Sequence, residues 1–457
     1  MTTLMDVVAL GASPDARPGE TKNAAPIGGG FKPLAGAPAP AARKAAGTGH
    51  SVVVERCQVC DWPQLEPVLF LGYLPPVNTM HAIGARPSEQ PAYPAQVLRC
   101  PKCSLVQLGL VVDPAVLFPP TYPYTSGTTR VLRENFAELA REVASLYPLE
   151  PTDLVVDIGS NDGTLLSNFA DRGPVLGIEP TNAGRLAVEA GIPTYISFFN
   201  RSTVRRIVAE EGQAKLVTAT NVFAHVENVH EVVESVLELM HDDGLFITES
   251  HYLLPLVRTM QYDTVYHEHL RYYSLASLKH LLEMHDLEVV HAKAIPTHGG
   301  SIRVYASRKG KHPVRDTVAA MLTAEAPELT AQKLKDFARK VVHTKLGLCK
   351  LLQDVKSKGQ RIYGVGAPSR ASTLVNYVGI DEGVVDCVLE IHGSHKIGKY
   401  MPGTLIPVLE ETKLFDDQPE YAMLFSWHIA DELIPKLRQR GFKGKFIVPL
   451  PEPRVVS

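Results

Sequence analysis

The sequence lacks the features that would assign it to a nucleic-acid-binding or a membrane protein. Its 457 residues carry a net charge of −3 and contain no basic tract, which argues against a nucleic-acid partner. No apolar run reaches the ~18 residues that a membrane-spanning helix requires. The first residues do not combine a basic region with an apolar core, so we expect no secretory signal. We therefore expect neither a nucleic acid nor a membrane as a partner.

Cysteine is also scarce, and four of the six cysteines are paired by their spacing. Cys57 and Cys60 form one C-x-x-C pair, and Cys100 and Cys103 form a second. Together the pairs can supply a tetrahedral shell of four thiolates, which predicts one structural Zn²⁺ with no open position for catalysis. The alternatives are two redox dithiols or four reduced buried thiols, but no thioredoxin-like βαβ pattern surrounds either pair. Reduced zinc-binding cysteines and the missing signal indicate a cytoplasmic protein.

The composition changes along the chain in a way that predicts a tail and three domains. Residues 1–50 are rich in Ala, Pro and Gly without periodicity, so we expect a disordered tail. Residues 51–120 carry the cysteine pairs and short β-like runs, which is typical of a small domain that depends on its metal. Strand-like and helical runs alternate over residues 121–310 and again over residues 311–457. This alternation predicts an α/β protein with parallel, doubly wound sheets.

A strand-like run ending near Asp157 leads into a loop whose glycines permit close approach to a ligand. Gly159 and Gly163 flank Asn161, and the loop is not the G-x-G-x-x-G of a dinucleotide site. An acid before the first glycine and an Asn in the middle are similar to the S-adenosylmethionine (SAM) site of class I methyltransferases. Glu179 ends the next strand-like run, where a carboxylate can accept both ribose hydroxyls. The alternatives are an NAD site and a glycine turn without a ligand.

The densest group of titratable side chains is the Tyr-His-Glu-His run at Tyr266–His269. Asn221 and His225 follow another strand-like run, and ligands bind at the carboxyl ends of such strands. We therefore expect Asn221 to contact SAM and His225 to lie at the mouth of that site. Methylation of carbon requires removal of a proton alpha to a carbonyl, for which neutral imidazole is a suitable base. The alternatives for the run are structural histidines, or a second metal site built from its two histidines and its glutamate.

A second glycine loop, at Tyr363–Arg370, follows a strand-like run and opens a helix. Ser369 stands where the third glycine of a dinucleotide fingerprint belongs. The helix N-terminus can bind a phosphate, with Arg370 as a bidentate clamp and Gly366 in the same site. We expect the phosphate of a nucleotide-linked substrate there, and the alternatives are a structural turn and NAD.

With these motifs in order, the chain resembles the deoxysugar C-methyltransferase family, which methylates C3 of nucleotide-linked 4-keto-6-deoxysugars. The resemblance covers nearly everything after residue 50. It rests on the zinc pairs, the SAM loop and Asn-Val-x-Ala-His, and on the motifs at Tyr266–His269, Gly299–Arg303, Gly366–Pro368 and Lys396–Thr404. It implies a small N-terminal zinc-binding domain, a central class I (Rossmann-like) SAM methyltransferase domain, and a second Rossmann-like α/β domain that grips the nucleotide.

The resemblance also implies roles for individual residues. It places the catalytic base at His269, and an upstream active-site tyrosine at Tyr122 or, in preference, Tyr124. The other catalytic and substrate-binding residues that we expect are Tyr266, Glu268, His225, His298 and Arg303.

The sequence thus predicts a SAM-dependent C-methyltransferase acting on C3 of a dTDP- or GDP-linked 4-keto-6-deoxysugar, as a monomer or a small homo-oligomer. Two other hypotheses remain at this point. One is an NAD-dependent oxidoreductase that acts on a sugar nucleotide through the C-terminal glycine loop. The other is a non-enzymatic zinc scaffold with vestigial α/β domains.

Overall fold

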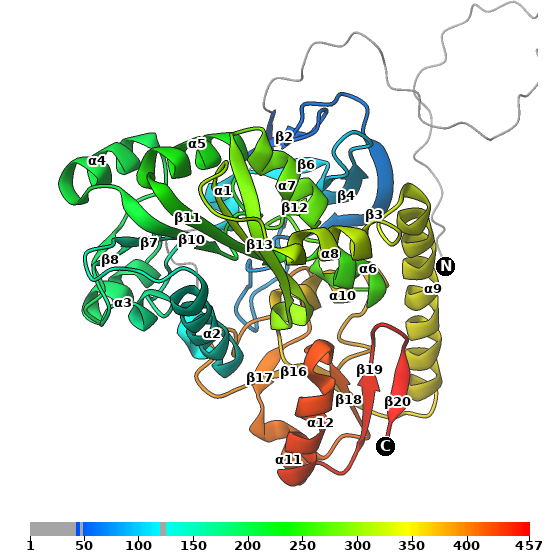
Figure 1. The fold of residues 1–457 in the computed structure, drawn as a ribbon. Coiled ribbons are helices and arrows are strands. Elements are labelled where there is room, and N and C mark those ends of the chain that lie inside the picture. Colours follow the sequence, from blue (N-terminus) through cyan, green and yellow to red (C-terminus); the bar gives the residue numbers. More distant parts are fainter. Residues whose placement is uncertain (1–42, 46–48, 119–124) are drawn as a thin grey trace, which may run out of the picture. The chain divides into compact units, whose positions relative to one another are not determined.

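A computed structural model describes residues 43–45, 49–118 and 125–457, with the elements labelled in Figure 1. Most of the expected tail and both candidate tyrosines, Tyr122 and Tyr124, lie outside the described residues. The end of the expected tail differs from the prediction, because β1 (Arg43–Ala45) pairs antiparallel with β2 (Gly49–Val53). Strand β2 pairs in turn with β6 (Leu110–Val112), so ladder hydrogen bonds order a stretch whose composition indicated no structure.

An antiparallel sheet of four strands, in the order β12-β5-β4-β3, carries the cysteines. Its strands are β3 (Glu66–Leu74), β4 (Tyr93–Arg99), β5 (Val106–Leu108) and β12 (Arg271–Tyr272). Three of them come from the predicted zinc-binding domain, and a short helix, α1 (Pro114–Leu117), follows them. The fourth strand comes from far along the chain, within the sequence range assigned to the methyltransferase domain.

The central sheet has seven strands in the order β13-β14-β11-β10-β7-β8-β9. Its strands are β7 (Val155–Ile158), β8 (Val175–Ile178), β9 (Thr194–Tyr195), β10 (Ala214–Thr220), β11 (Met240–His251), β13 (Leu287–Ile295) and β14 (Ser301–Arg308). The first five run parallel, and β14 and β13 add antiparallel at one edge. The order reverses between β7 and β10, which is the switch point where doubly wound sheets bind ligands.

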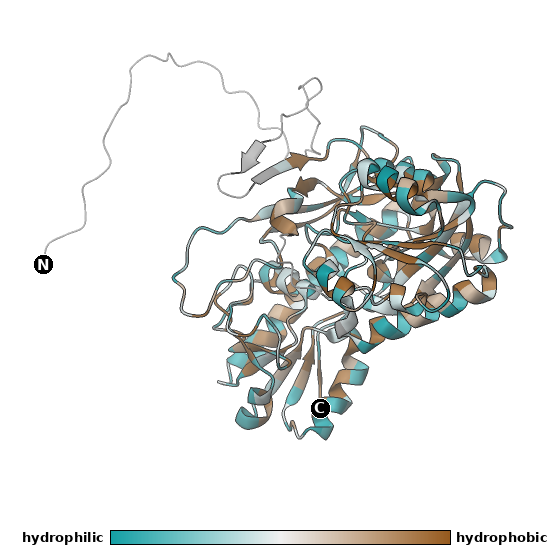
Figure 2. Ribbon diagram, turned by 90° about the vertical axis from the view of Figure 1, so that its left-hand side faces the viewer, coloured by the Kyte–Doolittle hydropathy of each residue, from teal (hydrophilic) through white to brown (hydrophobic). Residues whose placement is uncertain are grey.

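Helices connect these strands and follow the apolar periodicity of the sequence. They are α2 (Arg130–Leu146), α3 (Ala183–Glu189), α4 (Arg201–Glu211), α5 (Val229–Leu239), α6 (Leu253–Arg258) and α7 (Leu275–Glu283). In Figure 2 the strands are largely brown, whereas the helices alternate between brown and teal. Each helix therefore buries one apolar stripe and leaves its polar side outside the core.

The C-terminal part forms a second α/β unit after α8 (Asp316–Glu325) and the long α9 (Ala331–Lys356). Its sheet has the order β17-β16-β15-β18-β19-β20 and is parallel except for β20. Its elements are β15 (Ile362–Val365), α10 (Ser369–Val378), β16 (Cys387–Glu390), β17 (Val408–Glu410), α11 (Thr412–Asp417), β18 (Tyr421–Leu424), α12 (Ala430–Gln439), β19 (Lys445–Val448) and β20 (Arg454–Val456). The predicted fold class is confirmed. No helix within the described part of the chain is long and apolar enough to cross a membrane.

Candidate active site and metal centre

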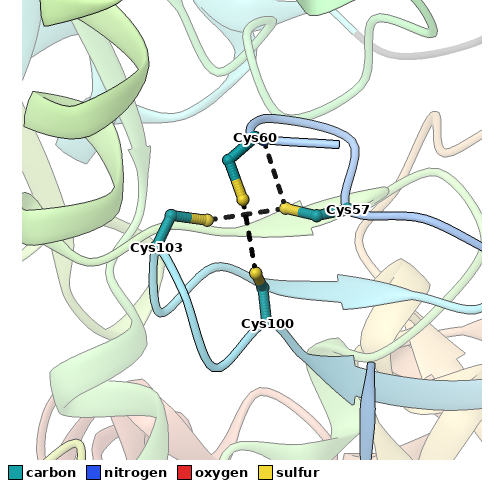
Figure 3. A group of neighbouring side chains, drawn as sticks. All are labelled: Cys57, Cys60, Cys100 and Cys103. Carbon is teal, nitrogen blue, oxygen red and sulfur yellow. Dashed lines mark hydrogen bonds between the residues drawn. The ribbon is translucent and has the colours of Figure 1, made fainter. Parts of the chain in front are cut away.

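The four paired cysteines converge on one point, as Figure 3 shows. The Sγ atoms of Cys57 and Cys103 lie 3.5 Å apart, and those of Cys60 and Cys100 lie 3.4 Å apart. All four sulfurs lie within 4.8 Å of one another. Zn–S bonds of ~2.3 Å in a tetrahedron place sulfurs ~3.8 Å apart, so this donor set fits Zn²⁺. A closed shell of four thiolates supports the structural role that the sequence predicts.

The loop after β7 has the backbone conformation that its glycines permit. Gly159 and Gly163 have φ values of +66° and +78°, and Asn161 between them has a φ of 51°. A Cβ atom at Gly159 would lie 2.4 Å from Cγ2 of Val222, the second residue after β10. The side chain of Asn161 also accepts a hydrogen bond of 2.8 Å from the backbone N–H of Ser126. The loop is therefore packed against the neighbouring loop and against the segment before α2.

Buried carboxyl groups make this loop a fit for a ligand with positive charge. Burial, with the negative charges of Glu179 and Glu249, raises the pKa of Asp157 to about 8, although Thr218 donates to it at 2.6 Å. At neutral pH this acid therefore binds a proton, and a nearby cation would favour the ionised form. SAM carries a sulfonium and an ammonium group, so the charge of the site and the cofactor are complementary.

Glu179 directly follows β8, and its carboxylate holds the glycine loop in place. It accepts hydrogen bonds from the backbone N–H groups of Asn161 at 3.1 Å and Thr181 at 2.8 Å. Each carboxylate oxygen has a second lone pair, so these contacts are compatible with binding of ribose hydroxyls. Asn221 follows β10 with a φ of 58°, and its N–H donates to Glu249 O at 2.8 Å. It lies at the carboxyl end of β10, and its contact with SAM stays a prediction.

Glu179→Ala should weaken SAM binding, because the carboxylate that we assign to the ribose hydroxyls is lost. A charge-assisted hydrogen bond contributes about 1.5–3 kcal/mol, which corresponds to roughly 10-fold to 150-fold in Kd. Calorimetric titration with SAM measures the change. Glu189→Ala, at an exposed position at the end of α3, is the matched control and should bind SAM like the wild type. An unchanged affinity in Glu179→Ala would remove Glu179 from the site.

His269 lies at the centre of a group of aromatic and imidazole rings. The ring centroid of Tyr266 is 4.1 Å from that of His269, and the centroids of His225 and His251 are 5.0 Å and 6.2 Å away. The Nδ1 atom of His269 lies 2.8 Å from the carbonyl oxygen of Thr264. Because a carbonyl only accepts, Nδ1 carries the proton and Nε2 carries the lone pair. This tautomer leaves Nε2 as the basic atom of the ring.

The ring of His225 is oriented in the same way by the backbone of the Tyr-His-Glu-His run. Its Nδ1 donates to the carbonyl oxygen of Glu268 at 2.5 Å, so its Nε2 is also unprotonated. His225 comes three residues after Val222, which contacts the glycine loop. Its position at the mouth of a SAM site stays a prediction.

Burial keeps the side chains of both His269 and Tyr266 uncharged. It lowers the pKa of His269 well below its usual value, and the charges that His225 and His251 would carry lower it further. Burial also raises the pKa of Tyr266 well above its usual value, as does the negative charge of Glu268. At neutral pH a neutral imidazole therefore lies against a protonated phenol. One can accept a proton and the other can donate a hydrogen bond.

The alternative of a second metal site is wrong. His267 turns away from the cluster, and its Nε2 donates to the carbonyl oxygen of Pro94 at 3.3 Å. Within the described ranges, the four cysteines are the only group of three or more His, Cys, Asp or Glu side chains close enough to share a metal. Burial lowers the pKa of His267 to about 4, so it is a neutral structural histidine.

Arg303 does not reach the site, contrary to the prediction that it contacts the substrate. Its side chain on β14 is fully enclosed and donates to Glu249 at 2.5 Å, Glu138 at 2.6 Å and Glu142 at 2.8 Å. Another of its nitrogens donates to the side chain of Asn135 at 3.0 Å. Its partners lie on β11 and α2, far from Arg303 in the sequence, so the Gly-Gly-Ser-x-Arg motif gave no sign of this buried network.

Arg370 lies in the wall of the site, but its guanidinium is already used. It donates to both carboxylate oxygens of Asp263, at 2.8 and 2.7 Å, and stacks 4.8 Å above the ring of Trp427. The indole N–H of Trp427 donates to the same carboxylate at 2.7 Å. The clamp predicted for a phosphate therefore holds a protein carboxylate, which ties α10 to the 3₁₀ turn at Tyr262–Thr264.

The other residues predicted to bind the substrate differ in what surrounds them. His298 is exposed, has a φ of 56° and lies within electrostatic range of Arg370 and His225. Gly366 has a φ of +80°, where a Cβ atom would lie 2.7 Å from Ser426 Oγ. Ser369 is the first residue of α10. Their contact with a substrate stays a prediction.

Several residues of the site were missed by sequence reasoning. They are Asn78, His251, Asp263, Lys396 and His428. His251 ends β11, so its place at the carboxyl end of a parallel strand could have identified it. Burial, followed by the charge of Arg370, lowers the pKa values of His251 and His428 to about 3. The contacts of the four residues other than His251 join distant parts of the chain.

Three family models match successive parts of this chain, from the cysteine pairs to the C-terminal α/β unit. A family model described as a zinc binding domain matches residues 57–118, "Methyltransferase domain" matches residues 131–292, and "C-methyltransferase C-terminal domain" matches residues 296–451. The C-methyltransferase NovU of Streptomyces niveus is 32% identical over 412 residues, covering 88% of this chain and 97% of NovU.

Two similar solved structures each cover about two fifths of this chain. Magnesium protoporphyrin IX methyltransferase of Synechocystis PCC 6803, solved with bound SAM, is 13% identical, with a TM-score of 0.30 over 39% of this chain and 79% of that one. A SAM-dependent methyltransferase of Anabaena variabilis is 16% identical, with a TM-score of 0.30 over 40% of this chain and 86% of that one.

Proposed function

Because this chain belongs to the family of zinc-containing, SAM-dependent C-methyltransferases, we propose that it methylates C3 of a nucleotide-linked 4-keto-6-deoxysugar. The observation that carries the proposal is the contact between a neutral His269 and a protonated Tyr266, with His225 between them and the glycine loop. Carbon becomes a methyl acceptor only after deprotonation, and a 4-keto group acidifies the proton on C3. A base and a hydrogen-bond donor side by side suit that reaction.

In the proposed reaction His269 removes the C3 proton with Nε2. Its Nδ1–H stays bound to the carbonyl of Thr264, which holds the ring and supports the imidazolium that forms. The hydroxyl of Tyr266 donates to the developing enolate oxygen. The carbonyl of Glu268 holds the ring of His225 beside that of His269, where His225 can accept the proton from the imidazolium. SAM, when bound, supplies an electrophilic methyl group to the nucleophilic carbon.

The nucleotide of the substrate is assigned to the C-terminal α/β unit. Ser369, the first residue of α10, offers its backbone N–H to a phosphate at the helix N-terminus, and His298 lies beside the sugar. Gly366 belongs to the same loop, but its N–H donates to the carbonyl of Leu389 at 2.8 Å. Arg370 contributes its positive charge, but its guanidinium N–H groups already donate to the carboxylate of Asp263. The nucleotide is dTDP or GDP in this proposal. The thiolates of the zinc site support the cytoplasmic location expected from the sequence.

Mass spectrometry of a panel of dTDP- and GDP-linked 4-keto-6-deoxysugars, each incubated with the zinc-loaded protein and SAM, tests the proposal. The expected product is heavier by one CH₂ group, and NMR should place the new methyl on C3. A methyl on oxygen or nitrogen, or no product with any member of the panel, would contradict it. Oxidation of NADH by the same substrates would favour the oxidoreductase alternative.

A further inference from the structure

The segment that carries the catalytic groups is built into the sheet of the zinc-binding domain. Strand β12 begins two residues after His269 and pairs antiparallel with β5, with Arg271 opposite Gln107 and Tyr272 opposite Val106. The N–H of Leu108 also donates to the carbonyl of Leu270 at 2.9 Å. The register of this ladder therefore fixes where the backbone of the Tyr-His-Glu-His run lies.

Both cysteine pairs are tied to β5. Cys100 and Cys103 form the turn that joins β4 to β5, where the N–H of Ser104 donates to the carbonyl of Cys100 at 3.0 Å. The fully buried side chain of Gln107 accepts a hydrogen bond from the N–H of Gln58 at 2.9 Å and donates to the carbonyl of Arg56 at 3.3 Å. The first pair thus reaches β5 through Gln107, and the second is continuous with it.

The zinc-binding domain also contacts the run directly through side chains. Asn78, in the loop after β3, donates from Nδ2 to Oε1 of Glu268 at 2.7 Å. His267 donates to the carbonyl of Pro94 and packs edge-on against Tyr93, with ring centroids 5.6 Å apart. Two successive side chains of the run are therefore held by this domain.

Glu268 connects this contact to both catalytic histidines. Its carbonyl oxygen accepts the Nδ1–H of His225, and His269 is the next residue in the chain. The ammonium of Lys396, which donates to the carbonyl of Ala367 at 2.5 Å, interacts electrostatically with the Glu268 carboxylate. If Glu268 were no longer anchored by its side chain and its backbone shifted, the carbonyl that orients His225 and the backbone that carries His269 would move with it.

We propose that the zinc-binding domain is a working part of the active site, and that Asn78 is the positioning residue through which it holds Glu268. The catalytic meaning of this inference rests on the proposed function, but the contact itself does not. An amide suits this role because it donates a hydrogen bond without adding a charge beside Lys396 and the carboxylate. Asn78 does not touch the reacting atoms and acts only through Glu268.

The first test measures structure without any substrate. Backbone hydrogen–deuterium exchange of the full-length, zinc-loaded protein should become faster over residues 264–272 in Asn78→Ala, with one zinc per chain retained. Glu66→Gln is the matched control, because it removes an ion pair with Arg99 at 2.9 Å in the same domain without contacting the run. Unchanged exchange in Asn78→Ala, an equal change in Glu66→Gln, or loss of zinc would each overturn the inference.

The second test uses the sugar nucleotide that turns over in the panel. Asn78→Ala should lower kcat for methyl transfer by about 10²-fold, as expected for a misplaced catalytic group, while SAM affinity is unchanged. Asn78→Asp should be worse at pH 8 and recover partly towards pH 6. Two facing carboxylates raise each other's pKa, and one shared proton restores the hydrogen bond. A purely structural defect would show no such recovery, and that result would refute the positioning role.

Lys396 and Tyr266 also face Glu268 but are common to all variants, so they cannot produce a difference between Asn78→Ala and Asn78→Asp. The two tests fail independently. If no sugar nucleotide is methylated by the wild type, the proposed function fails, and the exchange experiment still decides whether Asn78 holds the run. If the wild type is active and the exchange over residues 264–272 does not respond, the inference alone fails.

Discussion

His269→Asn should abolish methyl transfer while leaving the fold and SAM affinity intact. The Nδ1–H of this imidazole is bound to the carbonyl of Thr264, which leaves Nε2 as the basic atom, and its ring centroid lies 4.1 Å from that of the protonated Tyr266. Loss of a general base costs about 10²- to 10⁴-fold in rate. The amide of Asn can still donate towards the carbonyl of Thr264, so the local backbone should be preserved.

Solvent deuterium exchange at C3 gives the clearest measurement, because it needs the base but no methyl donor. The wild type with S-adenosylhomocysteine and the keto sugar nucleotide should incorporate deuterium at C3, and His269→Asn should not. His392→Asn, at a fully exposed histidine, is the control and should behave like the wild type. If His269→Asn still exchanges while His225→Asn does not, the base is His225.

The pH dependence of this exchange follows from the environment of His269. Burial lowers its pKa well below 6.5, so the imidazole stays neutral and basic as the pH falls through 6.5. The rate of exchange should therefore remain constant from pH 8 to below pH 6.5 and fall only in more acidic solution. An acidic limb centred at 6.5 or above would indicate a solvated base and contradict the assignment.

Cys100→Ser should lose the zinc ion and unfold the zinc-binding domain. Binding of structural zinc contributes about 10–16 kcal/mol in small zinc domains, which exceeds the stability that such a domain has without it. Elemental analysis should find one zinc per wild-type chain and less in the variant, and limited proteolysis should cut within residues 51–120. Cys349→Ser, at a half-buried cysteine outside the cluster, is the control and should retain the metal.

The effect of Cys100→Ser should extend beyond that domain, because β12 pairs with β5. We expect methyl transfer to be lost together with the zinc, even though no cysteine lies among the catalytic rings. SAM binding, which depends on the loop after β7, should be retained in part. A variant that keeps one zinc per chain, or a wild type with two, would refute the assignment of the four cysteines.

The features that could be predicted from the sequence are those whose geometry is local. Two residues between cysteines are enough to place two thiolates on one metal, and a glycine-containing loop after a buried strand defines a ligand site wherever the strand lies. The alternation of strands and helices likewise follows from periodicity over a few residues, so both α/β units were predicted. The proximity of His225 to the glycine loop was also predictable, because both follow neighbouring parallel strands.

The partners of charged side chains could not be predicted in this way. A guanidinium binds a protein carboxylate or a substrate phosphate through the same pair of N–H donors. The residues next to an arginine in the sequence do not show which of these two partners it has. Arg303 and Arg370 were both assigned to the substrate, and the fold provides Glu249 for one and Asp263 for the other. The exclusion of His267 from the cluster has the same origin, since its partner Pro94 belongs to a different domain.

The sequence by itself determined the family, the zinc ligands, the glycine loop and the run to which we assign the base, since each is a short motif whose chemistry is contained within it. Only the tertiary structure decided that this run is paired with the zinc-bearing sheet, that Asn78 holds Glu268, and that His225 and His251 flank His269. These contacts join residues separated by long stretches of chain. Their formation depends on how whole sheets pack, and no local pattern of residue types records that.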